Sequence, residues 1–174
     1  MPVDIGSIKR NDQIAGAAAI LAFIFALIPG VVTASLKDDV KDAVGAAGLD
    51  TSDGVNLWHG FGVLAGLLLL VGVAGIVAAI LERSELESLP VRWITTGVWG
   101  LATLLVLIYG FTYDGGAPAG ADRFVDIGPG FVGYLLMLLC IVTTVVVALG
   151  AQESGEKLPG RSQTSGEATP PPAA

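Results

Sequence analysis

The stretch GVNLWHGFGVLAGLLLLVGVAGIVAAIL, residues 54–81, decides the fold class of this chain. Its 28 residues include no Asp, Glu, Lys or Arg. About 20 apolar residues in a helix are enough to cross the hydrocarbon core of a bilayer. Three more uncharged stretches occupy residues 13–36, 93–113 and 127–152. The sequence therefore predicts an all-α fold, an integral membrane bundle of four transmembrane helices.

Composition supports this class and excludes others. The 174 residues are 53% hydrophobic and only 14% charged, against about 25% charged in an ordinary soluble domain. This excludes a soluble globular protein. A net charge of −7 offers no basic face for nucleic acid. Cys140 is the only cysteine, which excludes an intrachain disulfide and a two-cysteine redox couple.

We expect helices at about residues 13–36, 56–81, 93–113 and 128–150, together forming a domain at residues 13–152. Residues 1–12 are expected to form a cytoplasmic segment. Residues 153–174 are rich in Gly, Ser, Thr, Glu and Pro, and such a segment cannot bury enough apolar area to offset its ordering entropy. We therefore expect a disordered cytoplasmic tail.

Two alternatives concern the first apolar stretch. Lys9-Arg10 precedes it and Val32-Thr33-Ala34 resembles a cleavage site, as in a signal peptide. Asp4 and Asp12 do not suit a signal peptide, so a retained helix is the prediction. Beyond this stretch, four apolar residues are spaced to share one helical face, which predicts an extension of the helix or a surface helix: Leu36, Val40, Val44 and Ala47.

Basic residues in the short flanks predict the topology. Four helices place both termini on one side of the membrane. Six basic residues belong to that side: Lys9, Arg10, Arg83, Arg92, Lys157 and Arg161. Three belong to the other side: Lys37, Lys41 and Arg123. Because cytoplasmic loops carry the excess of Lys and Arg, we expect a multi-pass protein of the cell membrane with both termini cytoplasmic.

Small residues recur at helical spacing and predict where helices pack. Such residues let helix backbones approach closely in a membrane. The candidates are Ala18, Ala22, Ala26, Gly30, Gly62, Gly66, Gly75 and Ala79. They fit packing within one bundle or the interface of a homo-oligomer.

The two halves of the chain look alike. Several residues match at a constant offset of 80, from Ile14 and Ile94 to Gly30 and Gly110. Gly60-Phe61 matches Gly130-Phe131 at an offset of 70. The matches suggest two tandem hairpins in parallel orientation, although apolar sequences of this composition also align by chance.

No catalytic or cofactor-binding constellation can be assembled in the apolar stretches. No charged residue or histidine lies in the middle of any expected helix, where such residues usually mark function. His59 is the only histidine, and we interpret it as an interfacial polar residue beside Trp58, with a pH sensor or metal ligand as the alternative. Five threonines are expected to bond to their own backbone carbonyls: Thr95, Thr96, Thr103, Thr143 and Thr144.

The outer loops are acidic and offer candidate metal ligands. Oxygen ligands suit Ca²⁺ and Mg²⁺, and Asp50, Asp53, Asp122 and Asp126 are the candidates for weak divalent-cation binding. The stretch from Asp50 to Gly54 lacks the full spacing of a calcium loop and its closing Glu. A solvated acidic surface is the alternative.

Short motifs between residues 8 and 152 resemble a functionally uncharacterised actinobacterial-type family of small four-transmembrane-helix integral membrane proteins. The motifs are Lys9-Arg10 before Ile14-Ala15-Gly16, Leu27-Ile28-Pro29, Asn56-x-Trp58-x-x-Phe61 and Gly128-Pro129-Gly130-Phe131. Members commonly carry an aromatic residue directly after the first-helix proline, where this chain has Gly30. The resemblance implies the fold, the topology and a cell membrane of that type, and no chemistry.

These observations favour a non-enzymatic accessory or scaffold protein that packs against a larger membrane or cell-envelope complex. We expect its partners to be the lipid bilayer and another membrane protein or further copies of itself, with no nucleic acid and no cofactor. One alternative is a small oligomeric channel or carrier module. Another is a cation-sensing membrane protein that uses the acidic outer loops.

Overall fold

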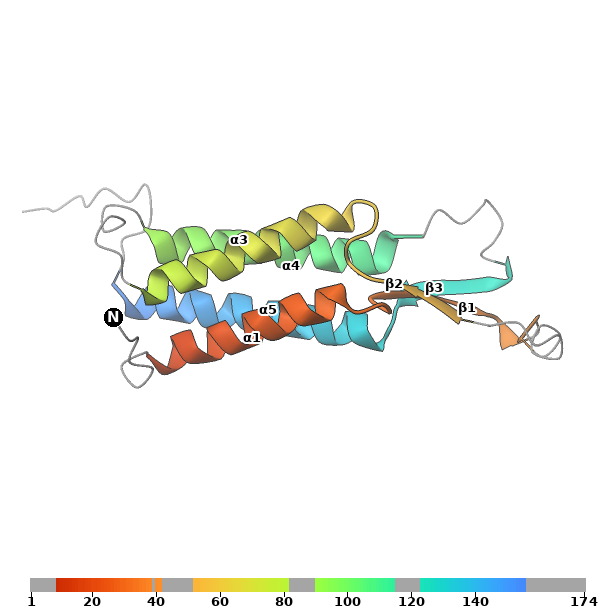
Figure 1. Cartoon of the computed structure of the whole chain (residues 1–174), viewed down its shortest axis with the longest axis horizontal. Coiled ribbons are helices and arrows are strands. Elements are labelled where there is room, and N and C mark those ends of the chain that lie inside the picture. Colours follow the sequence, from red (N-terminus) through yellow and green to blue (C-terminus); the bar gives the residue numbers. More distant parts are fainter. Residues whose placement is uncertain (1–8, 39, 42–51, 82–89, 115–122, 156–174) are drawn as a thin grey trace, which may run out of the picture.

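Four long helices lie side by side with a small sheet at one end (Figure 1). The computed structural model describes residues 9–38, 40–41, 52–81, 90–114 and 123–155. The helices are α1 (Arg10–Leu27), α3 (Gly62–Ile80), α4 (Val91–Thr112) and α5 (Phe131–Glu153), and the strands are β1 (Val32–Leu36), β2 (Ser52–Val55) and β3 (Val125–Pro129). All four helices are long and apolar enough to cross a membrane.

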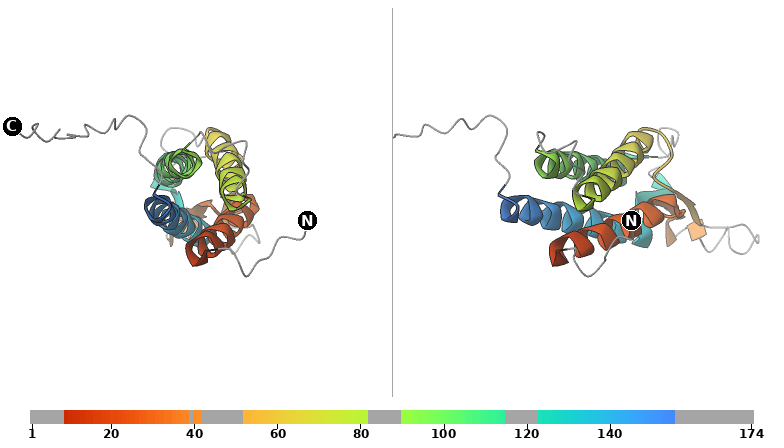
Figure 2. Two further views of the ribbon diagram at one scale, coloured as in Figure 1. Left: turned by 90° about the vertical axis from the view of Figure 1, so that its left-hand side faces the viewer. Right: turned by 60° about the vertical axis from the view of Figure 1, so that its left-hand side comes forward.

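The helices form a ring in the order α1, α3, α4, α5, so that α1 and α4 lie diagonally opposite each other (Figure 2). The start of α1 and the end of α5 lie at one end of the bundle, here called the Asp12 end. The sheet lies at the other end, here called the sheet end. Helices of 18 to 23 residues are roughly 27 to 35 Å long, close to the thickness of a bilayer core.

The sheet corrects the all-α expectation: the protein is mostly helical, but β1 pairs antiparallel with β2 on one side and β3 on the other. The expected first helix, residues 13–36, is wrong beyond Leu27 because Pro29 restricts Ile28 to an extended backbone, with ψ of 132°. β1 then follows from Val32. Leu36 lies in this strand, Val40 follows in a helical turn, and Val44 and Ala47 lie outside the described residues.

Backbone hydrogen bonds join the end of α1 to the segment before α3. The last carbonyls of a helix have no partner within the helix. Here the Leu57 amide donates to the Ala26 carbonyl at 3.1 Å, and the Asn56 side-chain amide donates to the Leu27 carbonyl at 3.3 Å. The amides of Gly30 and Val31 both donate to the Val55 carbonyl. Residues far apart in sequence thus complete the end of α1.

Glycines let these segments approach. Gly30 has a φ of +103°, which other residues rarely adopt. A Cβ added to Gly54 would lie 3.0 Å from the backbone of Gly30. The two segments therefore pass each other backbone to backbone, and Val31 and Leu57 beside them are fully buried.

The interior of the bundle combines small residues with a few large aromatic side chains. Trp99 and Tyr109, both on α4, are fully buried. Their rings lie over α3 glycines: a Cβ on Gly72 would be 2.6 Å from the Trp99 ring nitrogen, and one on Gly62 would be 2.8 Å from the Tyr109 ring. The α3 glycines thus accommodate rings from the neighbouring helix.

The predicted packing residues occupy two environments. Ala18, Ala22, Ala26, Gly62 and Gly66 are buried, whereas Gly30, Gly75 and Ala79 are partly buried. Gly66 lies against the Trp58 ring.

The burial pattern repeats between the two halves. Ala22 on α1 and Ala102 on α4 are both fully buried, and Leu21 and Leu101 are both exposed, which matches the offset of 80 found in the sequence. For α3 and α5 the buried positions coincide at an offset of 71, as in Leu69 with Cys140. That offset differs by one residue from the 70 suggested by Gly60-Phe61.

Gly72 and Gly97 provide a matched test of this packing. We expect Gly72→Ala to lower the free energy of unfolding by about 1–3 kcal/mol, since the buried Trp99 ring cannot move aside. A Cβ on Gly97 would meet nothing within 4 Å, so Gly97→Ala should be neutral or stabilising by about 1 kcal/mol or less. Thermal unfolding in mild detergent measures both. Equal stability of the two variants would contradict the packing described here.

Candidate functional site

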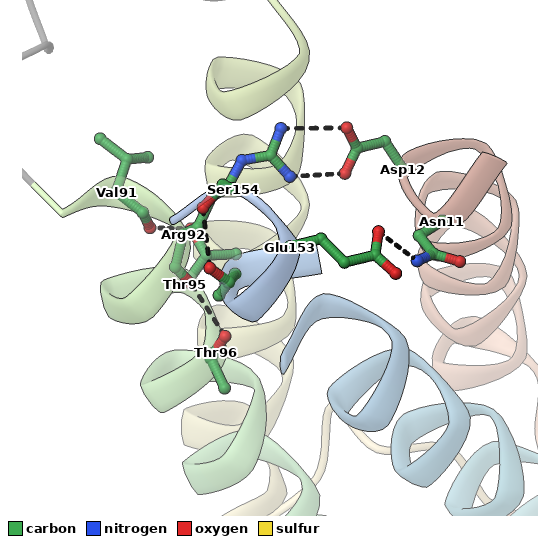
Figure 3. Close-up of polar contacts among 9 residues, drawn as sticks. Asn11, Asp12, Val91, Arg92, Thr95, Thr96, Glu153 and Ser154 are labelled. Atoms are coloured by element: carbon green, nitrogen blue, oxygen red, sulfur yellow. Dashed lines mark hydrogen bonds and ion pairs between the residues drawn. The ribbon is translucent and has the colours of Figure 1, made fainter. Parts of the chain in front are cut away.

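A nearly buried ion pair joins two diagonal helices at the Asp12 end (Figure 3). Arg92 Nη1 donates to Asp12 Oδ1 at 2.7 Å, and Arg92 Nη2 donates to Asp12 Oδ2 at 3.0 Å. The side chains are only 12% and 14% exposed, for Arg92 and Asp12 respectively. Two parallel charge-assisted hydrogen bonds of this kind are strong and geometrically specific.

The local sequence places both groups in first turns of helices. Asp12 lies in the first turn of α1, where the helix dipole favours a negative charge. Arg92 is the second residue of α4, and a positive charge at a helix N-terminus is disfavoured by the same dipole. The Asp12 carboxylate therefore compensates a guanidinium in an unfavourable position.

Neighbouring residues complete this end of the bundle. Asn11 donates a side-chain hydrogen bond to Glu153 Oε2 at 2.8 Å, which links α1 to α5 (Figure 3). Gly150 passes close to the pair, since a Cβ there would lie 3.4 Å from Arg92 Nη1 and 3.5 Å from Asp12 Oδ1. The absence of a side chain at residue 150 thus leaves room for the pair.

A small cavity of about 10 Å³ adjoins the ion pair, enough for about one water molecule. Its lining comes from all four helices: Asp12, Ala15, Ile76, Ala79, Arg92, Thr95 and Val147. Apart from the ion pair and the Thr95 hydroxyl, which donates to the Val91 carbonyl at 2.8 Å, the lining is apolar. The cavity therefore offers no set of polar groups converging on a ligand.

Asn56 organises the sheet end. Its Oδ1 accepts hydrogen bonds from the Trp58 amide at 3.0 Å and from His59 Nδ1 at 2.8 Å. Its backbone carbonyl accepts a hydrogen bond from the Tyr109 hydroxyl at 3.1 Å. The Asn56 Nδ2 group donates to the Leu27 carbonyl, which orients Oδ1 toward His59. Because a carbonyl oxygen only accepts hydrogen bonds, His59 Nδ1 is the donor in this contact. His59 is exposed and hydrogen-bonded beside Trp58.

Aromatic rings pack together next to Asn56. Tyr109 and Tyr113 stack with centroids 4.6 Å apart, and Phe61 meets the Tyr109 ring edge-on at 5.2 Å. The three rings contact one another directly, so they form a packed cluster.

The prediction for the threonines is confirmed at four of five positions. The hydroxyls of Thr95, Thr96, Thr143 and Thr144 donate to the carbonyl four residues earlier. Thr103 differs: its hydroxyl lies 2.9 Å from that of Thr144. This hydrogen bond joins α4 to α5.

The four candidate metal ligands are described only in part. Asp53 lies in β2 opposite Ala34, and Asp126 lies in β3 opposite Ser35. Asp126 is exposed and forms an ion pair with Lys37 at 3.8 Å, while Asp50 and Asp122 lie outside the described residues. Within the described ranges, no three His, Cys, Asp or Glu side chains gather as metal ligands would. The weak cation site stays a prediction.

Sequence reasoning missed the pairing of Asp12 with Arg92. Arg92 contributes to the topology prediction as one of six basic residues on the same side. Asp12 contributes only as an acidic residue that does not suit a signal peptide. A signal was nevertheless present, because the offset of 80 that relates Ile14 to Ile94 also relates residue 12 to residue 92. Opposite charges at equivalent positions of two diagonal helices are the pattern that could have found it.

No protein-family model, curated protein or solved structure matches this chain. The resemblance to small actinobacterial four-helix proteins therefore stays a prediction.

Asp12 and Asp126 allow the ion pair to be tested with one type of substitution. Asp12→Asn should lower the free energy of unfolding by about 3 kcal/mol, because it leaves the Arg92 guanidinium nearly buried without its counter-charge. Asp126→Asn breaks an exposed pair and should change stability by about 1 kcal/mol or less. Thermal unfolding at neutral pH in mild detergent measures both. A harmless Asp12→Asn would mean that water or another group replaces the carboxylate.

Proposed function

We propose that this chain is an integral protein of the cell membrane and acts there as a non-enzymatic accessory or scaffold protein. The observation that carries the membrane assignment is the distribution of side-chain size. Buried positions on α1 and α3 are largely Ala and Gly, whereas large aliphatic side chains point outward on all four helices. In water, this surface would far exceed the exposed apolar patches of soluble monomers. In lipid, small residues inside and large residues outside are the expected arrangement.

We further propose that the Asp12 end faces the cytoplasm and the sheet end faces outward. Lys9, Arg10 and Arg92 lie at the Asp12 end, and the sequence adds Arg83, Lys157 and Arg161 to the same side. Lys37, Lys41 and Arg123 belong to the sheet end. The excess of basic residues supports this orientation.

The parallel-hairpin arrangement belongs to the same proposal. The first hairpin would be α1 with α3, and the second α4 with α5. The matched burial at offsets of 80 and 71 supports this, since corresponding residues then face the interior together. β2 and β3, which precede α3 and α5, also both pair with β1. These features favour two equivalent units with the same direction in the membrane.

An accessory role fits the interior better than transport through one copy. Large side chains fill the bundle between its ends, and Leu69, Trp99 and Leu136 are fully buried there. No Asp, Glu, Lys, Arg or His lies in the middle of any helix that the structure describes, although proton-coupled transport depends on such groups. The outward apolar surface and the partly exposed sheet remain as places for a partner.

Accessibility of introduced cysteines tests the orientation. In a Cys140→Ala background, we expect the thiol introduced by Arg123→Cys to react with an impermeant maleimide on intact cells. The thiol introduced by Gln152→Cys should react only after the membrane is permeabilised. Both residues are exposed, so burial does not confuse the comparison. Labelling of the Gln152→Cys variant on intact cells would overturn the orientation.

Purification in mild detergent from membranes with native expression tests the accessory role. We expect a stoichiometric complex with other membrane or envelope proteins. The control is the same extraction after the chain carries Gly72→Ala, which should weaken the fold and release the partners. A pure homo-oligomer that conducts ions in liposomes would instead favour the channel alternative.

A further inference from the structure

We propose that the Asp12–Arg92 ion pair is a latch that holds the Asp12 end of the bundle closed over the adjoining cavity, and that the bundle opens at this end while the sheet end stays fixed. This device goes beyond an accessory role. It also does not depend on which way the protein faces in a membrane.

The two ends of the bundle are joined by different kinds of contact. At the sheet end, backbone groups connect segments far apart in sequence: the Gly130 amide donates to the Val31 carbonyl at 3.2 Å, and the Val31 amide donates to the Val55 carbonyl at 2.9 Å. At the Asp12 end, the described contacts between helices include the Asp12–Arg92 and Asn11–Glu153 side-chain pairs. Side-chain contacts can exchange for water one at a time, whereas paired strands separate cooperatively. The sheet end is therefore the natural fixed point.

The ion pair also spans the diagonal of the bundle. It joins α1 to α4, which lie opposite each other in the ring (Figure 2). The ion pair thus ties together two helices that otherwise share few contacts. The cavity next to the pair is lined by residues from every helix, so a release of the diagonal would let water enter among all four.

The desolvation of the Asp12–Arg92 pair favours an exchange between a closed and an open form of the Asp12 end. Removing a carboxylate and a guanidinium from water carries a desolvation penalty that offsets much of their attraction. Arg92 adds the unfavourable position at a helix N-terminus. An open form, in which both groups regain water, recovers that penalty and so offsets part of the free energy lost when the pair separates.

Thiol labelling of the purified protein in detergent measures opening at the Asp12 end. The probe is Thr95→Cys in a Cys140→Ala background, since Thr95 is 4% exposed and lines the cavity. The matched control is native Cys140, fully buried on α5 further from the Asp12 end. Asp12→Asn, added to each protein, should raise labelling by N-ethylmaleimide about tenfold or more at the Thr95→Cys thiol, because labelling follows the open population. Cys140 should label as slowly as before.

A reversal of the charges tests whether pairing itself is responsible. Because residues 12 and 92 occupy equivalent positions, Asp12→Arg combined with Arg92→Asp should rebuild the pair and return labelling to the original rate. Arg92→Lys keeps the positive charge but loses the bidentate hydrogen bonding. In this variant the Thr95→Cys thiol should be labelled at a rate between those of the original protein and of Asp12→Asn. This variant decides the question if the reversed protein does not fold.

Three results would overturn the latch. The first is an unchanged labelling rate at the Thr95→Cys thiol in Asp12→Asn. The second is an equal increase at Cys140, which would indicate general loosening of the fold. The third is a folded charge-reversed protein, or an Arg92→Lys protein, that labels as fast as Asp12→Asn.

Discussion

The structure depends on how the chain satisfies its backbone polar groups where α1 ends. Pro29 stops the helix, and in apolar surroundings the carbonyls left without helical partners must bond elsewhere. Leu57 and Asn56 supply donors to Ala26 and Leu27, while Val55 accepts from Gly30 and Val31. These bonds bring the start of α3 against the end of α1, and β3 adds itself to β1 in front of α5. The strands thus determine where three of the four helices begin or end relative to one another.

Beyond the sheet end, the packing of the bundle depends on the sizes of its side chains. The glycines of α3 leave space that Trp99 and Tyr109 occupy, and the buried face of α1 consists of alanines. The large aliphatic side chains are left to face outward, which is stable only beside lipid or a partner protein. Threonines add little polarity to this interior, since most of their hydroxyls bond to their own helix. Packing and backbone bonding therefore account for the middle of the molecule.

Polar side chains are concentrated instead at the two ends of the bundle. The sheet end is joined by hydrogen bonds of Asn56, and the Asp12 end by an ion pair. Asn56 joins α1, His59 and Tyr109 through hydrogen bonds of its side chain and its backbone carbonyl. At the Asp12 end, a charged pair with little exposure lines a small cavity. A scaffold with one end fixed by strands and one end held by charges can transmit a partner's binding as a change in helix separation. That consequence links the proposed accessory role to the proposed latch.

The sequence alone predicts the number and approximate place of the long helices, because a helix able to cross a bilayer needs only a local stretch of sufficient length without charge. It also determined most of the threonine hydrogen bonds, since their acceptors lie one turn away on the same helix. The sheet and the pairing of Asp12 with Arg92 were decided by tertiary structure. Val32 pairs with Pro129, and Asp12 meets a residue 80 positions later. Contacts over such separations depend on how whole helices assemble, and no local pattern of apolar residues specifies that assembly.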